Sequence, residues 1–263
     1  MKIAICFYGI TRNFAQHTLE SIQRQLFDVV AKHDPNFKRF AHINLLAELN
    51  NERTREFNVP IDPEEYKLLN CDVVTTTDQR LVDERIDFKY LSQFGNTWND
   101  NFGTLKNVLR QFYSVNEVTQ TMLQESAKTP FDLVIYSRIC LRYEKPVEIP
   151  SRILPGTLYT PWFERYRGLN DRFALGDVPT MAAYGRRQSR AREFCAETGL
   201  PMGAENYLLW YARKEGLKTR HLRKMNFGRV RADGKEERIR DDVPERLKYF
   251  YKLALEKAGL RSY

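Results

Sequence analysis

The sequence lacks the long apolar run that would mark a membrane-spanning protein. None of its segments approaches the roughly 20 apolar residues that cross a bilayer. The apolar stretch at residues 3–10 is short, and Thr11-Arg12-Asn13 follows it without a small-residue cleavage site, which does not match a secretory signal peptide. We therefore expect a cytoplasmic protein with at most peripheral membrane association.

Cysteine and histidine are scarce and scattered. The cysteines are Cys6, Cys71, Cys140 and Cys195, with no C-x-x-C pair, and the four histidines show no metal-ligand spacing. This distribution argues against a structural zinc site. It favours reduced, mostly buried thiols in a reducing compartment.

The common nucleotide and nucleic-acid signatures are also absent. The sequence contains neither G-x-G-x-x-G nor G-x-x-x-x-G-K-[ST], so it does not support assignment to the Rossmann dehydrogenases or the P-loop NTPases. Without a helix-turn-helix, zinc-finger or RNP pattern, we expect no nucleic-acid partner. The formal charge is nevertheless +8. A phosphorylated substrate, an anionic surface or a solvated exterior would each account for it, and a basic binding module for nucleic acid or anionic surfaces stays an alternative.

What is present is an alternation of strand and helix patterns. An apolar run ending in Gly9 predicts a buried parallel strand at residues 2–9. Further strands are expected at 38–46, 71–76, 131–139, 158–163 and 217–222, and helices around 19–30, 103–126, 178–197, 203–215 and 243–258. Segments 77–102 and 223–241 are expected to be irregular. The alternation predicts an α/β fold with a mostly parallel sheet flanked by helices.

The turn after the first strand carries groups that bind phosphate. Gly9, Thr11 and Arg12 can offer backbone N–H groups, a hydroxyl and a guanidinium to a diphosphate. The alternative is an exposed β-to-α turn without a ligand.

The helix at 103–126 carries a polar stripe beside its apolar one. Asn107, Arg110, Gln111 and Ser114 fall at i, i+3, i+4 and i+7, so they share one side of the helix. Asn107, Arg110 and Gln111 are candidates for the wall of a nucleotide pocket. The alternative is an ordinary solvated face.

Four segments, in this order, resemble a known family. They are LKNVLRQFYSVNEV (105–118), FDLVIYSRICLRYEKPVEIP (131–150), LNDRFALGD (169–177) and AENYLLWYARKEGL (204–217). They are similar to small GT-A-like glycosyltransferases of bacterial polysaccharide loci and large DNA viruses. The resemblance implies a GT-A-like (Rossmann-like) fold in a single domain over 1–263. Its parts would be a nucleotide-sugar-binding half (1–145), an acceptor-side half (146–240) and a C-terminal helix (241–263).

The resemblance also raises the question of a metal. In that family the strand that matches 131–139 usually ends in Arg-x-Asp, and the acid helps to bind a divalent cation and the sugar diphosphate. Arg138 matches, but Cys140 stands in place of the acid. Because a thiol is a poor ligand for Mg²⁺ or Mn²⁺, we assign no metal ligand, and the need for Mn²⁺ or Mg²⁺ stays open. Arg12, Arg110 or Arg138 would then neutralise the departing diphosphate. Alternatively, the replacement of the acid by Cys140 could mean that the protein is catalytically degenerate.

The acceptor side offers two candidate bases. An inverting transferase needs a carboxylate to take the proton of the acceptor hydroxyl. The two candidates are Asp171 and Glu205. As alternatives to a catalytic role, Asp171 could form an ion pair with an arginine, and Glu205 could stabilise the N-terminus of a helix. The predicted function is transfer of a hexosyl or pentosyl group from a nucleotide-sugar donor, expected to be UDP-linked, to a saccharide or glycolipid acceptor.

Overall fold

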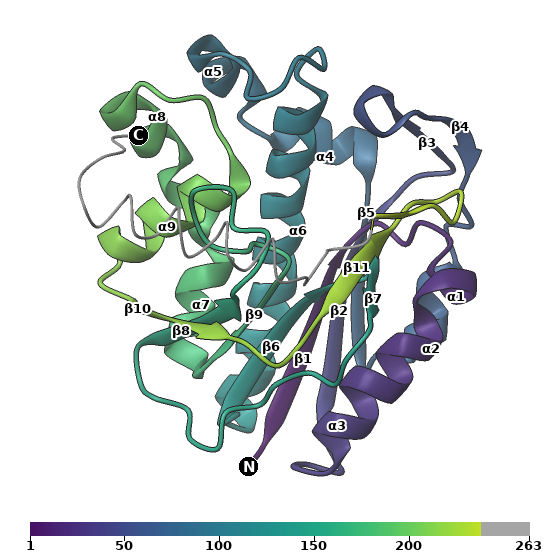
Figure 1. The fold of residues 1–263 in the computed structure, drawn as a ribbon, viewed down its shortest axis with the longest axis vertical. Coiled ribbons are helices and arrows are strands. Elements are labelled where there is room, and N and C mark those ends of the chain that lie inside the picture. Colours follow the sequence, from purple (N-terminus) through teal and green to yellow (C-terminus); the bar gives the residue numbers. More distant parts are fainter. Residues whose placement is uncertain (238–263) are drawn as a thin grey trace.

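The strands expected from the sequence pair into one central sheet. The computed structural model describes residues 1–237. Its sheet has the order β10 (Lys218–Leu222), β8 (Thr157–Pro161), β9 (Phe173–Gly176), β6 (Leu133–Arg138), β1 (Ile3–Gly9), β2 (Lys38–Leu45) and β5 (Val73–Asp78) (Figure 1). β9 runs antiparallel to β6 and β8, and the other neighbours are parallel. The predicted class, a mostly parallel sheet flanked by helices, is confirmed.

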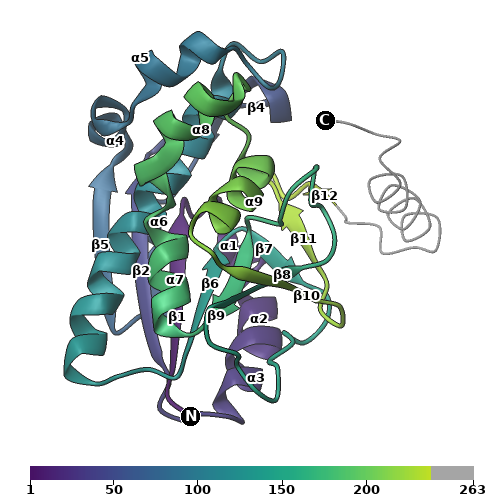
Figure 2. The same ribbon diagram turned by 90° about the vertical axis from the view of Figure 1, so that its left-hand side faces the viewer.

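The central strand β1 is buried on both faces because its side chains alternate between two cores. Ile3, Ile5 and Phe7 pack toward the helical segment after β1. That segment comprises α1 (Phe14–His17), α2 (Leu19–Ile22), a π-helical turn (Gln23–Phe27) and α3 (Asp28–Ala31). Ala4 and Cys6 pack on the other face, against α6 (Gly103–Lys128) and α7 (Val178–Gly185). Figure 2 shows these two layers on either side of the sheet.

The helix predicted at 178–197 is broken in the middle. α7 ends at Gly185, a 3₁₀ turn spans Arg187–Arg190, and α8 follows at Ala191–Thr198. The break turns Arg187 fully into the interior, where its guanidinium carbon lies 4.1 Å from the Tyr184 ring centroid. Its Nη1 donates to the Tyr184 backbone oxygen at 2.9 Å. The helix predicted at 203–215 is confirmed as α9 (Ala204–Lys214).

Several short elements were not predicted from the sequence. Segment 77–102 contains α4 (Gln79–Arg85) and α5 (Phe88–Leu91), and a hairpin joins β3 (Glu48–Asn51) to β4 (Glu56–Pro60). Segment 223–241 was expected to be a loop, and this is wrong for part of it. β11 (Phe227–Val230) pairs there with β7 (Leu141–Tyr143) and with β12 (Glu236–Glu237). The helix predicted at 243–258 lies outside the described residues. Within residues 1–237, no helix has the length and apolar character needed to cross a bilayer.

Candidate functional site

The ends of β1 and β6 lie side by side at one edge of the sheet. The two strands are parallel neighbours, with Tyr8 opposite Arg138. Beyond β1 the chain turns sharply, since Gly9, Arg12 and Asn13 all have positive φ angles. The Gly9 N–H donates to Ser114 Oγ on α6 at 2.9 Å, and the neighbouring Thr11 is buried. The turn is therefore fixed against α6 before any ligand binds.

Arg12 is a buried cation held by one carboxylate. It is 9% exposed, and its Nη1 lies 3.1 Å from an oxygen of Glu56 at the start of β4. Glu56 also accepts from the Ala232 N–H at 2.8 Å, and Asn13 Nδ2 donates to the Ala232 oxygen at 2.8 Å. Within residues 1–237 the Arg12 Nε has no hydrogen-bond partner. One buried donor of this guanidinium therefore remains for another acceptor.

The positive charges of four arginines act on the thiol of Cys140, and we call these four residues the arginine cluster. They are Arg12, Arg138, Arg229 and Arg231. Burial by itself would raise the pKa of Cys140, but the positive charges of the cluster lower it below its ordinary value. The Cys140 thiol in turn helps to raise the pKa of Arg138 against the effect of burial. The charges of the arginine cluster thus favour the ionised form of the Cys140 thiol.

This environment does not fit a divalent cation. Oxygen ligands are what Mg²⁺ and Mn²⁺ prefer, whereas Cys140 is a sulfur ligand among four positive charges. Among the described residues no group of three or more His, Cys, Asp or Glu side chains is placed to hold a metal. The donor set at Cys140 suits an anion instead.

Three carboxylates gather around Arg172 next to this edge, and we call Glu164, Asp171 and Glu205 the carboxylate cluster. Arg172 is 3.2 Å from Glu164, 3.2 Å from Glu205 and 3.6 Å from Asp171. The backbone N–H of Arg138 donates to the Arg172 oxygen at 3.1 Å. Because this bond joins the end of β6 to the residue before β9, the carboxylate cluster adjoins the arginine cluster.

The two candidate bases have opposite electrostatic environments. Burial raises the pKa of Asp171, but Arg172, Arg138 and a 2.7 Å hydrogen bond from Gln111 bring it below its ordinary value. Burial and the nearby Asp171 charge raise the pKa of Glu205 to about 7, with Arg172 opposing them. Asp171 is therefore held ionised, while Glu205 exchanges its proton near neutral pH. Two carboxyl groups with pKa values driven apart are a frequent feature of acid–base sites.

The backbone of the Glu164–Gly168 loop positions Glu205. Glu164, Tyr166 and Arg167 all have positive φ, which is uncommon outside glycine. A Cβ at Gly168 would lie 1.7 Å from the Glu205 backbone oxygen, so only glycine fits there. The loop therefore packs directly on the first turn of α9, where Glu205 lies.

The polar residues of α6 have partners on two different sides of the helix. Gln111 faces the site and donates to Asp171. Arg110 instead pairs with Asp83 on α4, through bonds of 2.6 and 2.5 Å, and donates to Asn107 at 3.2 Å. Gln111 is thus brought together with Asp171 and, through it, with Arg138. Arg110 is engaged with Asp83 on α4, and Asn107 is engaged with Arg110.

Glu56, Glu164, Arg229 and Arg231 contribute to the site without having been singled out from the sequence. Of these four residues, only the two arginines lie in a sequence pattern that could have revealed them. Phe227-Gly228-Arg229-Val230-Arg231 alternates in the period of two that a strand requires. In Figure 1 the yellow end of the described chain runs from β11 toward the β3–β4 hairpin.

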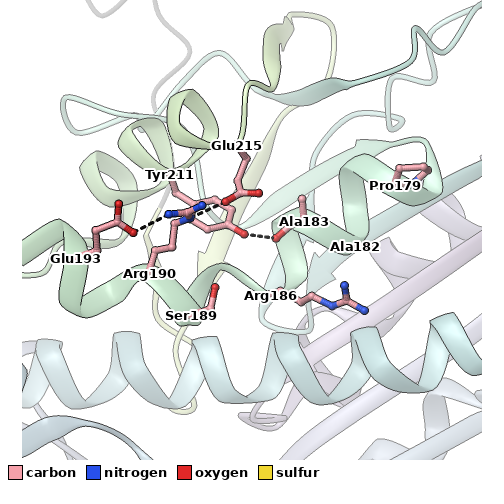
Figure 3. Close-up of a pocket in the computed structure, with 9 residues that line it drawn as sticks. All are labelled: Pro179, Ala182, Ala183, Arg186, Ser189, Arg190, Glu193, Tyr211 and Glu215. Carbon is pink, nitrogen blue, oxygen red and sulfur yellow. Dashed lines mark hydrogen bonds and ion pairs between the residues drawn. The ribbon is translucent and has the colours of Figure 1, made fainter.

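A hollow on the surface of the described residues lies away from the ends of β1 and β6. One of about 640 Å³ lies between α7 and α9 and is lined by Ala183, Arg186 and Tyr211 among others (Figure 3). There Arg190 bridges Glu193 and Glu215 at 2.7 Å each. The charged groups of this hollow are therefore engaged with one another. The candidate site is defined by the two charged clusters and not by this hollow.

Comparisons with known proteins find a likeness to solved structures only. No protein-family model matches the chain, and no curated protein matches it. Among solved structures, mouse xyloside xylosyltransferase 1 in its apo form is similar over 84% of each chain, with 12% identity and a TM-score of 0.42. The likeness is too distant to assign an activity to this chain.

Proposed function

We propose that this protein is a glycosyltransferase that moves a hexosyl or pentosyl group from a nucleotide-sugar donor to a saccharide or glycolipid acceptor. The observation that carries the proposal is the contact between an arginine cluster and a carboxylate cluster at the carboxyl edge of the sheet. Open α/β sheets bind ligands at this edge. Sugar transfer from a diphosphate requires both clusters, one for the leaving group and one for the acceptor.

The arginine cluster would bind the diphosphate of the donor. When the bond between the anomeric carbon and the diphosphate oxygen breaks, negative charge develops on that oxygen. Fixed guanidinium groups at this point stabilise the charge without reorganisation. A UDP-linked donor is the first to test. The proposed mechanism assigns no step to a metal ion, because the residues around Cys140 do not suit one.

Glu205 is the better of the two candidate bases. The acceptor hydroxyl would attack the anomeric carbon while its proton passes to a Glu205 oxygen. Glu205 has a pKa of about 7, which suits proton transfer near neutral pH. Its side chain is 16% exposed, whereas that of Asp171 is 2% exposed. Asp171 would then act by keeping the pKa of Glu205 high and the pocket negative.

The test is ligand-induced thermal stabilisation. The protein is heated with UDP, GDP, ADP and CDP, each with and without Mn²⁺. We expect saturable stabilisation by one diphosphate, independent of Mn²⁺ and weakened about tenfold or more in Arg138→Gln. Arg192→Gln is the matched control, since Arg192 is exposed and paired with Asp87. If no nucleotide stabilises the protein, the proposed function is wrong.

A further inference from the structure

A second surface hollow, of about 500 Å³, lies beside β10 at the edge of the described sheet, and we call it the basic hollow. Its walls come from the loop between β7 and β8, from β8 and β10, and from the turn after β10. Arg220 on β10 is opposite Tyr159 on β8, so both side chains leave the same face of the sheet. The hollow shares no lining residue with the arginine cluster or the carboxylate cluster.

Hydrogen bonds fix the backbone around the basic hollow. A carboxylate oxygen of Glu148 accepts from the backbone N–H groups of Arg223 and Lys224, each at 2.6 Å. At the other end of β10, the Lys218 N–H donates to the Gly156 oxygen at 2.9 Å. The loop before β8 is thereby tied to both ends of β10. The two backbone segments that carry the cations of the hollow are therefore fixed relative to each other.

Three exposed cations line the basic hollow, namely Arg152, Arg220 and Lys224. Within residues 1–237 the side chains of these three form no ion pair and no hydrogen bond. Glu148, the one carboxylate of the lining, is already engaged with two backbone N–H groups. In the hollow between α7 and α9, by contrast, Arg190 bridges two glutamates at 2.7 Å each. The basic hollow therefore has a net positive charge and cationic donors that are free to bind an anion.

Uncharged groups complete the lining. Tyr159 is only 4% exposed, and its hydroxyl accepts from the Leu154 N–H at 3.3 Å. The proton of this hydroxyl has no acceptor within residues 1–237, so it remains available to a ligand. Ser151 adds an exposed hydroxyl, and the half-buried Ile149 forms part of an apolar wall. This mixture suits a ligand that joins an anionic group with several acceptor oxygens to a less polar part.

We propose that the basic hollow binds a phosphomonoester, carried either by a small soluble molecule or by the headgroup of an anionic phospholipid. The oxygens of a phosphomonoester accept well from the forked guanidinium groups of Arg152 and Arg220, while Lys224 adds a compact charge. The Tyr159 hydroxyl donates from the floor of the hollow. This binding involves no covalent step. It does not depend on the proposed transferase activity, because the two sites share no residue.

The experiment presents one chemical group in two forms to the full-length protein. Glycerol phosphate carries a soluble phosphomonoester and is titrated calorimetrically, with glycerol as the uncharged control. Phosphatidic acid carries the same group in phosphatidylcholine vesicles and is tested by cosedimentation, with pure phosphatidylcholine vesicles as the control. We expect binding that requires the phosphomonoester and weakens as salt is raised. Binding of glycerol phosphate alone would identify a soluble ligand, and binding of the vesicles alone would identify a lipid.

Variants locate the binding. Arg220→Gln and Lys224→Gln should each weaken it about tenfold. Arg213→Gln is the matched control, because Arg213 on α9 is exposed, forms no ion pair within residues 1–237 and does not line the hollow. It should leave binding unchanged. Melting temperatures should stay close to that of the parent in all three, since these cations are exposed.

The proposal would be overturned if neither form of the phosphomonoester bound, or if Arg213→Gln weakened binding as much as Arg220→Gln. Binding that Arg138→Gln abolishes and Arg220→Gln spares would place the phosphomonoester at the arginine cluster, and would also overturn it. The transferase is judged by a separate measurement, the stabilisation by nucleotides. Binding of glycerol phosphate that depends on Arg220, together with no stabilisation by any nucleotide, would reject the transferase and support the phosphomonoester site.

Discussion

The Tyr8 hydroxyl near the end of β1 donates to the backbone oxygen of Asp171 at 2.8 Å. The Tyr184 hydroxyl on α7 donates to the same oxygen at 3.1 Å. Asp171 is thus held from both sides, although it precedes β9 and lies far from β1 in the sequence. The bond fixes a residue of the carboxylate cluster relative to the strand that leads into the arginine cluster.

Removing these hydroxyls tests how firmly Asp171 is held. Tyr8→Phe and Tyr184→Phe should each lower the free energy of unfolding by about 1 kcal/mol, since one donor remains in either variant. The double variant should cost more than the two together, because the Asp171 oxygen then loses both strong donors in a buried position. Urea denaturation measures all three. Strict additivity would contradict the shared hydrogen-bonding role.

Glu205→Gln should have opposite effects on stability and activity. The folded protein keeps a proton on Glu205 up to about pH 7, while the unfolded chain loses it near its ordinary pKa of 4.5. Glu205 therefore makes the fold less stable as pH rises through this interval. The variant should gain up to roughly 3 kcal/mol at about pH 8, the equivalent of this pKa shift, and nothing at about pH 4. Transfer activity, which should rise with pH through about 7 in the parent, should fall at least about 100-fold.

Arg138 gives a cleaner test of diphosphate binding than Arg12. Arg12→Ala would leave Glu56 buried without its cation, which costs on the order of 3–5 kcal/mol. Arg138 makes no ion pair within residues 1–237, and its side chain is half-buried. Arg138→Gln should therefore lose diphosphate affinity while its melting temperature stays within a few degrees of the parent. Isothermal titration with UDP and a melting curve check both. A large loss of stability in Arg138→Gln would show a structural role instead.

Cys140→Asp tests the metal question directly. The new carboxylate would lie among four arginines. We expect it to pair with them and to weaken UDP binding about tenfold, because it competes with the diphosphate for the same charges. Titrations with and without Mn²⁺ should then agree. Tighter UDP binding in the presence of Mn²⁺ would instead show that the strand end can still form a metal site.

Gly168→Ala should disrupt the position of Glu205. The added Cβ would meet the Glu205 backbone oxygen, so either the loop or the start of α9 must move. We expect a loss of about 3 kcal/mol or more together with an altered pH profile. Gly199→Ala is the control. Gly199 has a positive φ but open space around it, and its replacement should cost only about 1 kcal/mol. Equal losses in both would show that the contact at Gly168 does not carry the expected cost.

The sequence anticipates the parts of the fold that bury long apolar patterns. The strand ending at Gly9, the strand ending at Arg138 and the helix from Gly103 were predicted from continuous apolar runs and a helical stripe. The strands β11 and β12 were not, because a strand of four residues and one of two acquire their structure from pairing with distant segments. Local patterns carry no information on that pairing.

The same distinction applies to the site. Arg12 follows β1 and Arg138 ends β6, and these strands run parallel, so their approach to one edge could be predicted from parallel topology. Asp171 reaches that edge because β9, which it precedes, runs antiparallel to β6, and the sequence pattern did not reveal this direction. Glu56 could not, since its contacts with Arg12 and with Ala232 join three segments that are distant in the sequence. The engagement of Arg110 with Asp83 also depends on α4, which the sequence pattern did not reveal.

The contacts of Ala232 affect the order in which the site can form during synthesis of the chain. The turn after β1 is synthesised long before residue 232, yet Asn13 and Glu56 find their partner only when residue 232 has left the ribosome. Most of the central sheet can pair before that moment, but the turn after β1 cannot be completed. The arginine cluster therefore stays unfinished until residue 232 is available.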